Sequence, residues 1–294
     1  RSHALLDLNV AAHDDALVLT IARGVRVAEP VRFALLSAGR SICHPRLHVV
    51  LEEGAEATLL DVFASTGSPF TNSAVLVSLA EGAILRHVRV QDESQAAFHT
   101  GLVAVDARRG SRYLSHAFAF GGVLSRHEID VRLLGEGAEA LLDGLFVAFG
   151  TQSSDQHLAV THAAPRTSSR QRYRGILGGE ARGAFDGKVV VAKGATHTEA
   201  HQMNRNLLLS QTATVDSKPQ LEIENNDVKA SHASTTGRLN DAALFYLRAR
   251  GIGEAEARAL LTRAFASEIV SAVPIAGLVP VLEGLVTASL GGSR

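Results

Sequence analysis

Apolar and polar residues alternate along much of the first half of this chain, a pattern typical of strands that bury one face. The segment 47–51 alternates in this way before a short turn, and the segment 129–133 does so before a later one. The turns carry Glu-Gly-Ala or Arg-Gly-Ser, and their glycines lie 28, 28 and 27 residues apart: Gly54, Gly82, Gly110 and Gly137. The pattern predicts a repeated unit of strand, glycine turn and strand.

A repeat that contains only strands and turns restricts the fold. No helical interval long enough for a crossover separates the strands, which disfavours a doubly wound sheet. One repeat cannot bury its own apolar face, whereas stacked coils share a continuous core. The repeat therefore predicts a mainly β protein with a β-helix or solenoid core, which continues through strands within 183–191, 206–209 and 221–224. A β-sandwich or a double-stranded β-barrel is the alternative.

The character of the chain changes near residue 240. Asn240 or Asp241 can cap a helix that Gly251 ends, and a second helix is predicted from about Glu254. Its predicted buried face comprises Ala257, Leu260, Leu261, Ala264 and Phe265. Residues 275–290 give a third helix. The predicted organisation is a β-helix core over residues 1–239 and a small helical region over residues 240–294.

Composition narrows the range of functions. Lys and Arg number 29 and Asp and Glu 30, so bulk charge gives no support to nucleic-acid binding. Aromatic residues make up 5% and tryptophan is absent, which disfavours a stacking platform or a carbohydrate cleft. Cys43 is the single cysteine, so no internal disulfide or all-cysteine metal site is expected. This fits a reducing compartment, and a cytoplasmic location is expected. Pro274, Pro280 and Glu283 interrupt the apolar stretch 269–290, so no membrane span is expected.

Two groups of residues are candidates for chemistry. His197, Glu199 and His201 alternate, and on a curved strand two imidazoles and a carboxylate could bind iron or zinc; a polar outer face of the solenoid is the alternative. His157 and His162 lie near Ser168 and Ser169, but no Gly-x-Ser-x-Gly elbow exposes a nucleophile. No phosphate-binding loop is present, so nucleotide binding by this chain is not expected.

Several longer strings carry a resemblance to a known family. They are Val50–Ala55, Tyr173–Leu177, Asn204–Ser210, Lys218–His232 and Leu244–Ile252. Together they resemble the SufB/SufD family of iron–sulfur cluster assembly scaffolds, over roughly residues 45–270. The resemblance implies a right-handed parallel β-helix followed by C-terminal helices. It also implies a scaffold subunit without turnover of its own.

The resemblance also implies partners. In this family SufD pairs with its paralogue SufB, and each binds a copy of the ABC-type ATPase SufC through the C-terminal helices, while a cysteine desulfurase delivers sulfur. The SufD branch is favoured because SufB carries the sulfur-accepting cysteine, whereas this chain has no cysteine in its C-terminal half. Pairing with a SufB-like paralogue is expected, and the isolated chain can form a homodimer.

His232 is the residue that the resemblance assigns to the shared site. It is the histidine of the Lys-x-Ser-His string, and Ala230 stands where some relatives have a cysteine. The implied cofactor is a nascent iron–sulfur cluster, transient and shared with the partner, with none bound by this chain alone. Two enzyme classes remain as alternatives: a β-helix enzyme acting on polysaccharides, and a metal-dependent β-barrel enzyme using His197, Glu199 and His201.

Overall fold

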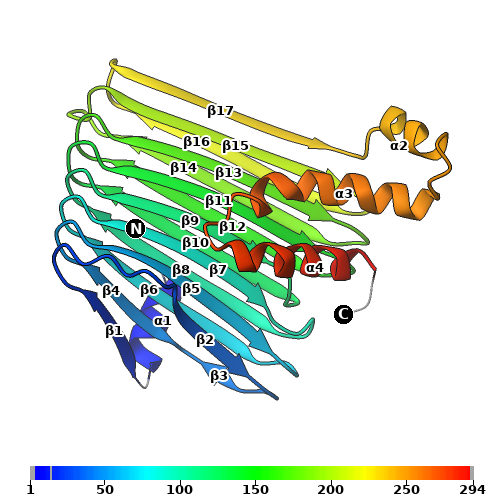
Figure 1. Ribbon diagram of the computed structural model, residues 1–294, viewed down its shortest axis with the longest axis horizontal. Helices are drawn as coiled ribbons and strands as arrows, with labels where there is room; N and C mark the ends of the chain where they lie inside the picture. The colour runs from blue at the N-terminus through cyan, green and yellow to red at the C-terminus, as the bar shows by residue number, and fades with distance from the viewer. Residues whose placement is uncertain (1–3, 14, 292–294) are drawn as a thin grey trace.

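The computed structural model describes residues 4–13 and 15–291, which form a parallel β-solenoid with helices packed on it (Figure 1). Strands alternate between two parallel sheets along the chain. Sheet A has the order β1-β4-β6-β8-β10-β12-β14-β16, with β3 also paired to β6, and sheet B has the order β17-β15-β13-β11-β9-β7-β5-β2. The predicted β-helix is confirmed, and the sandwich and barrel alternatives are not observed.

The strands are regular in length over the central coils. Those of sheet A are β1 (Ala16–Ile21), β3 (Ile42–Cys43), β4 (Arg46–Leu51), β6 (Phe70–Leu79), β8 (Phe98–Ala107), β10 (Leu124–Leu133), β12 (Ser153–His162), β14 (Arg182–Val191) and β16 (Thr214–Ile223). Those of sheet B are β2 (Val31–Ser37), β5 (Glu56–Ser65), β7 (Ile84–Asp92), β9 (Arg112–Ala119), β11 (Glu139–Ala148), β13 (Ser168–Leu177), β15 (Thr198–Leu208) and β17 (Val228–Gly237).

The repeated glycines stack at one edge of the solenoid. Gly54, Gly82 and Gly110 have φ values of +67°, +67° and +59°, in the left-handed region that glycine adopts without strain. The N–H of each donates to a carbonyl of the following turn at 2.9 Å. Beyond Gly137 the same position is held by Arg166 (φ 56°) and His197 (φ 55°). The repeat continues where the glycine signal stops, which explains why the sequence period fades after residue 150.

The interior is apolar beside the glycine turns and polar farther along the coils. Val49, Leu85 and Val131 belong to the main core. Elsewhere inside the solenoid, the His87 ring lies 2.8 Å from Asp61 Oδ2 and 2.9 Å from the Tyr113 hydroxyl. Such buried polar groups are stable only where they find hydrogen-bond partners within the protein or in ordered water.

The last two of the C-terminal helices pack on the outer face of sheet B. Helix α2 (Asp241–Arg248) leads to α3 (Glu254–Val270), a 3₁₀ turn (Ala276–Leu278) and α4 (Val279–Leu290), as Figure 1 shows. The predicted Asn240 cap is confirmed, with its side chain accepting from the Ala243 N–H at 3.0 Å. Helices α3 and α4 share a buried cluster with sheet B that includes Phe118, Leu145, Ile269 and Leu282. The helices are therefore part of the packed structure.

The predicted buried face of α3 is partly wrong. Ala257 is buried, but Leu260 and Ala264 are exposed, and Leu261 and Phe265 are half-buried. The buried positions nearer the end of the helix are Thr262, Ala266, Ile269 and Val270. Docking onto sheet B selects this face, because alanine and leucine occur on more than one side of the helix.

Charged groups fix α3 to the sheet. Arg174 of β13 donates to the carbonyl oxygen of Phe265 and to the Glu268 carboxylate. Arg172 donates two hydrogen bonds to Asp143, at 2.8 and 2.5 Å, and its Nη1 lies 3.5 Å from Glu268 Oε1. The hydrogen bond to Asp143 is the largest of the effects that raise the pKa of Arg172. These bonds set the orientation of α3 on the outer face of sheet B.

Helix α1 (Ala4–Ala12), which the sequence did not predict, packs on the outer face of sheet A near β6. The amide of its buried Asn9 donates to the carbonyl oxygens of Asn72 at 2.8 Å and Pro45 at 3.3 Å. In return, Asn72 donates to the Leu5 carbonyl oxygen at 2.9 Å. Polar contacts, rather than an apolar stripe, hold this helix in place.

One buried histidine gives the fold a specific pH dependence. His162 of β12 is fully buried, with its ring nitrogens 2.8 Å from Thr167 Oγ1 and 2.9 Å from Ser169 Oγ. Burial lowers the pKa of His162 from 6.5 to about 4. The unfolded chain therefore takes up this proton at higher pH than the folded chain. The contribution of His162 to stability is complete above pH 6.5 and is lost as the pH falls toward about 4.

We expect His162→Gln to flatten the pH dependence of the free energy of unfolding between pH 6.5 and 4. Glutamine does not titrate, so a slope of about 1.4 kcal/mol per pH unit is removed. Urea unfolding of both proteins at several pH values in this range measures the difference. Equal slopes would show that His162 is not held neutral by burial.

Candidate functional site at the open C-terminal coil

The solenoid ends in two edge strands. Within the described part of the chain, β16 pairs with β14 alone and β17 pairs with β15 alone (Figure 1). Most side chains of both strands are exposed or half-buried. Each edge leaves a row of backbone N–H and C=O groups available for another strand. This open coil is the candidate functional site.

His232 lies on β17, in register with Gln202 of β15. Register partners in a parallel sheet place their side chains on the same face. Gln202 points into the solenoid and is buried, so His232 belongs to the same inward-facing row, yet it is exposed. The difference arises because no further coil follows this one among the described residues, and an imidazole is therefore presented at the open end.

Hydroxyl and amide groups line the open end beside His232. The Ser234 hydroxyl donates to Ser217 Oγ across the coil at 2.7 Å. The Ser217 hydroxyl donates to Asn204 Oδ1 at 2.9 Å, and the Asn206 amide donates to the same oxygen at 2.6 Å. This chain of hydrogen bonds ties β16 to β17 and connects the open end to the buried interior.

Potential metal ligands are few around His232 in the described part of the open coil. Ala230, two residues before His232, is in register with Ala200 and offers no thiolate. Among the described residues there is no group of three or more His, Cys, Asp or Glu side chains that could hold a metal ion. Iron–sulfur clusters are held by several protein ligands, mostly thiolates.

The structure does not assemble His197, Glu199 and His201 into a metal site. His197 lies in a left-handed turn before β15, a correction to the predicted single strand, while Glu199 and His201 do share the exposed outer face of that strand. Each pairs with the next coil instead: His197 Nδ1 lies 2.8 Å from Asp227, Glu199 lies 3.0 Å from Lys229, and His201 lies 2.8 Å from Ser231. The alternative interpretation, that these residues form part of a polar outer face of the solenoid, agrees with this arrangement.

The serine–histidine candidates do not form an exposed pair. His162 Nε2 lies 2.9 Å from Ser169 Oγ, but both residues are buried. His157 lies on the outer face of sheet A, with Nδ1 3.9 Å from Asp186 Oδ2. Ser168 lies on sheet B. The arrangement gives no accessible nucleophile and base.

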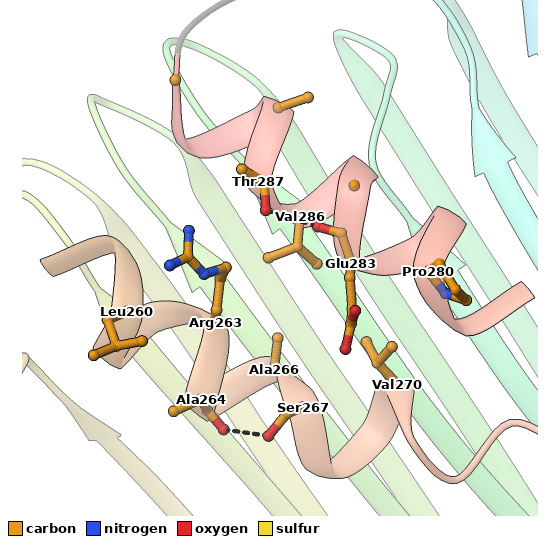
Figure 2. Close-up of a pocket in the computed structure, with 13 residues that line it drawn as sticks. Leu260, Arg263, Ala264, Ala266, Ser267, Val270, Pro280, Glu283, Val286 and Thr287 are labelled. Atoms are coloured by element: carbon orange, nitrogen blue, oxygen red, sulfur yellow. Dashed lines mark hydrogen bonds between the residues drawn. The ribbon is translucent and has the colours of Figure 1, made fainter. Parts of the chain in front are cut away.

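A second surface feature lies between α3 and α4. It is an apolar groove of about 940 Å³, in which Leu260, Ala264, Val270 and Val286 are lining residues (Figure 2). Arg263 and Glu283 contribute charges to the same groove. Leu260 and Ala264, which the sequence predicted to lie on a buried face, are exposed and line this groove instead.

Exposed aromatic residues lie on α2, which packs against α3. Phe245 is 73% exposed and Tyr246 is 55% exposed. The Arg250 guanidinium lies 3.5 Å from the centre of the Tyr246 ring. No helix in the described part of the chain has the length and apolar character to cross a lipid bilayer. Together, α2, α3 and α4 present exposed aromatic and aliphatic side chains beside the groove.

The amino-acid sequence of this chain is similar to those of several known proteins. The family described as "SUF system FeS cluster assembly, SufBD core domain" matches residues 34–265. The iron–sulfur cluster assembly protein SufD of Escherichia coli K12 is 32% identical over 289 residues, which cover 95% of this chain and 67% of that protein. A SufBD family protein of Synechocystis is 32% identical, covering 92% of this chain and 63% of the relative.

A SufBD family protein of Mycobacterium tuberculosis H37Rv is 35% identical over 276 residues, covering 90% of this chain and 68% of the relative. The chain thus spans about two thirds of the length of these relatives. The family match covers most of the solenoid as well as α2 and most of α3. The chain therefore belongs to the SufBD family of iron–sulfur cluster assembly proteins.

Proposed function

We propose that this chain is a SufD-like scaffold subunit that pairs with a SufB-like paralogue through its open C-terminal coil. The observation that carries the proposal is the exposed inward-facing row of β17, with His232 in it. In this arrangement the nascent cluster is cargo, built at the seam and passed on. The chain supplies position and one ligand, and it performs no turnover of its own. A cytoplasmic location is part of the proposal.

Strand pairing supports the choice of surface. The free edges of β16 and β17 offer backbone donors and acceptors along strands of ten residues each. A paralogue with the same coil geometry can continue both sheets and cover the exposed inward-facing row. A second copy of this chain has the same complementarity in principle, so a homodimer of the isolated subunit is also proposed.

The helical surface supports a second contact. The groove between α3 and α4 is apolar, and Phe245 and Tyr246 extend apolar surface along α2. We assign this surface to a SufC-like ABC-type ATPase. Because α3 is fixed to sheet B through Glu268, movement of a bound ATPase would be transmitted to the coils near the seam.

The chemistry at the seam follows from the donor set. A neutral imidazole nitrogen is a good ligand for iron, and thiolates from the partner would complete the coordination. A single ligand from this chain keeps the cluster labile when the partner separates. No observation favours the metal-dependent enzyme, since His197, Glu199 and His201 each pair with the next coil. The polysaccharide-acting enzyme was considered without named residues, and no observation favours it either.

If the two partners bind separate surfaces, a substitution on one surface should release only the partner bound there when this chain is co-expressed with a SufB-like and a SufC-like subunit. Ile223→Arg, at the exposed end of β16, is expected to abolish co-elution of the SufB-like subunit while the SufC-like ATPase stays bound. Ala264→Trp, which fills the groove between α3 and α4, is expected to do the reverse. Size-exclusion chromatography under reducing, low-salt conditions measures both.

A matched control is available at the opposite end of the solenoid. Leu17 on β1 is 53% exposed and Ile223 is 42% exposed, so Leu17→Arg introduces the same charge on a similar surface. We expect this variant to behave as the unmodified chain. The assigned surfaces would be contradicted if Leu17→Arg lost the SufB-like subunit. They would also be contradicted if all three variants retained it.

His232→Ala is expected to leave the co-expressed complex intact and to lower its bound iron and sulfide several-fold. The reason is that the variant removes a ligand from an exposed position and leaves the backbone of the edge strand unchanged. Iron and sulfide analysis of the purified complex measures the effect. His201→Ala, on the outer face of the neighbouring strand, is the control and should retain full loading. Equal loading of both variants would remove His232 from the site.

A further inference from the structure

Two glutamines form a ladder inside the last coils of the solenoid. Gln171 on β13 and Gln202 on β15 are register partners, with exposed fractions of 0% and 3%. Gln202 Nε2 donates to Gln171 Oε1 at 2.8 Å. Side-chain amides stacked on neighbouring parallel strands commonly bond in this way, each carbonyl oxygen accepting from the amide of the following strand.

The opposite sheet holds the Gln202 amide in place. Gly187 on β14 faces it across the interior, and a Cβ at that position would overlap the amide nitrogen of Gln202. The amide thus occupies the space that a side chain on β14 would otherwise take. The contact with Gly187 and the hydrogen bond to Gln171 together restrict how the amide can turn.

The oxygen of this amide is left without a partner. Gln202 Oε1 is buried, and no described group donates a hydrogen bond to it. Such an acceptor is costly to leave unpaired in a protein interior. The ladder continues to the next strand, where the register partner of Gln202 is His232, and an imidazole N–H is a suitable donor.

We propose that Gln202 is a positioning residue for His232, whose ring N–H donates to the buried Gln202 Oε1. This bond fixes which ring nitrogen carries the proton and leaves the other nitrogen, with its lone pair, directed out of the open coil. Ligating histidines are typically held in this way by a hydrogen bond from their second nitrogen. The use of the outward nitrogen as an iron ligand rests on the proposed function, whereas the hydrogen bond itself does not.

The tautomer of His232 tests the proposal in the isolated chain. Long-range ¹H–¹⁵N correlation spectra of ¹⁵N-histidine-labelled protein, recorded at a pH where His232 is neutral, give the ratio of its two tautomers, and His232→Gln assigns the signal. We expect one tautomer to predominate in the unmodified protein. Removing the acceptor with Gln202→Leu should change the ratio about fivefold, which corresponds to one net hydrogen bond.

Three further variants separate positioning from folding. Gln202→Glu retains an oxygen acceptor and should retain the tautomer. Gly187→Ala retains Gln202 but displaces its side-chain amide, so it should change the tautomer ratio in the same direction as Gln202→Leu does. This variant keeps the proposal testable if Gln202→Leu folds poorly. Gln156→Leu removes another buried glutamine, on β12, and should leave the ratio unchanged.

An equal tautomer ratio in the unmodified protein, Gln202→Leu and Gly187→Ala would overturn the proposal. A change of the same size in Gln156→Leu would also overturn it, because the effect would then be general to the interior. The ratio is read without partner, iron or sulfide, so its outcome is independent of cluster loading. Failure of the proposed function would appear instead as full iron and sulfide in His232→Ala.

Discussion

Each coil of this solenoid satisfies its backbone hydrogen bonds through the coils that precede and follow it, and within residues 4–13 and 15–291 no coil follows β16 and β17. The consequence is visible in β16 and β17, whose side chains become exposed although their register with β14 and β15 is unbroken. The same inward-facing row that is buried at Gln202 becomes accessible at His232. The open coil is thus a consequence of the repeat itself, and it is the place where a subunit of similar geometry can add strands without distorting either protein.

The interior and the helices make this end specific. A solenoid with a uniformly apolar core would expose only aliphatic groups at its last coil, whereas here Ser217, Ser234 and His232 reach the surface. The Gln171–Gln202 ladder extends the polar character inward from that surface. On the outer face of sheet B, Arg172 and Arg174 hold Glu268 of α3 close to the same coils. The two proposed partner surfaces are therefore parts of one continuous packed structure.

The sequence predicted the solenoid because its glycine turns and alternating strands are local signals. The glycine-turn signal weakens at Arg166 and His197, which adopt the left-handed conformation in place of glycine. Because no glycine marks the turn at His197, the sequence predicted a strand there. The capped start of α2 was also local and was found. The buried face of α3 was not predicted correctly. Contact with sheet B decides which of its alanines and leucines are covered, and the helix sequence alone does not show this. Helix α1 was missed because amide contacts from Asn9 hold it.

The candidate site was predictable only by family resemblance, which named His232. Nothing in the residues around it indicates a partner for the ring, since Gln202 lies 30 positions away and is brought into register by one full coil. Pairing through the open coil is tested most directly by hydrogen–deuterium exchange of this chain, free and bound to a SufB-like subunit. If β16 and β17 pair with the partner, exchange over residues 214–237 becomes slower on binding. Protection confined to the β1–β2 end, with residues 214–237 unchanged, would contradict it.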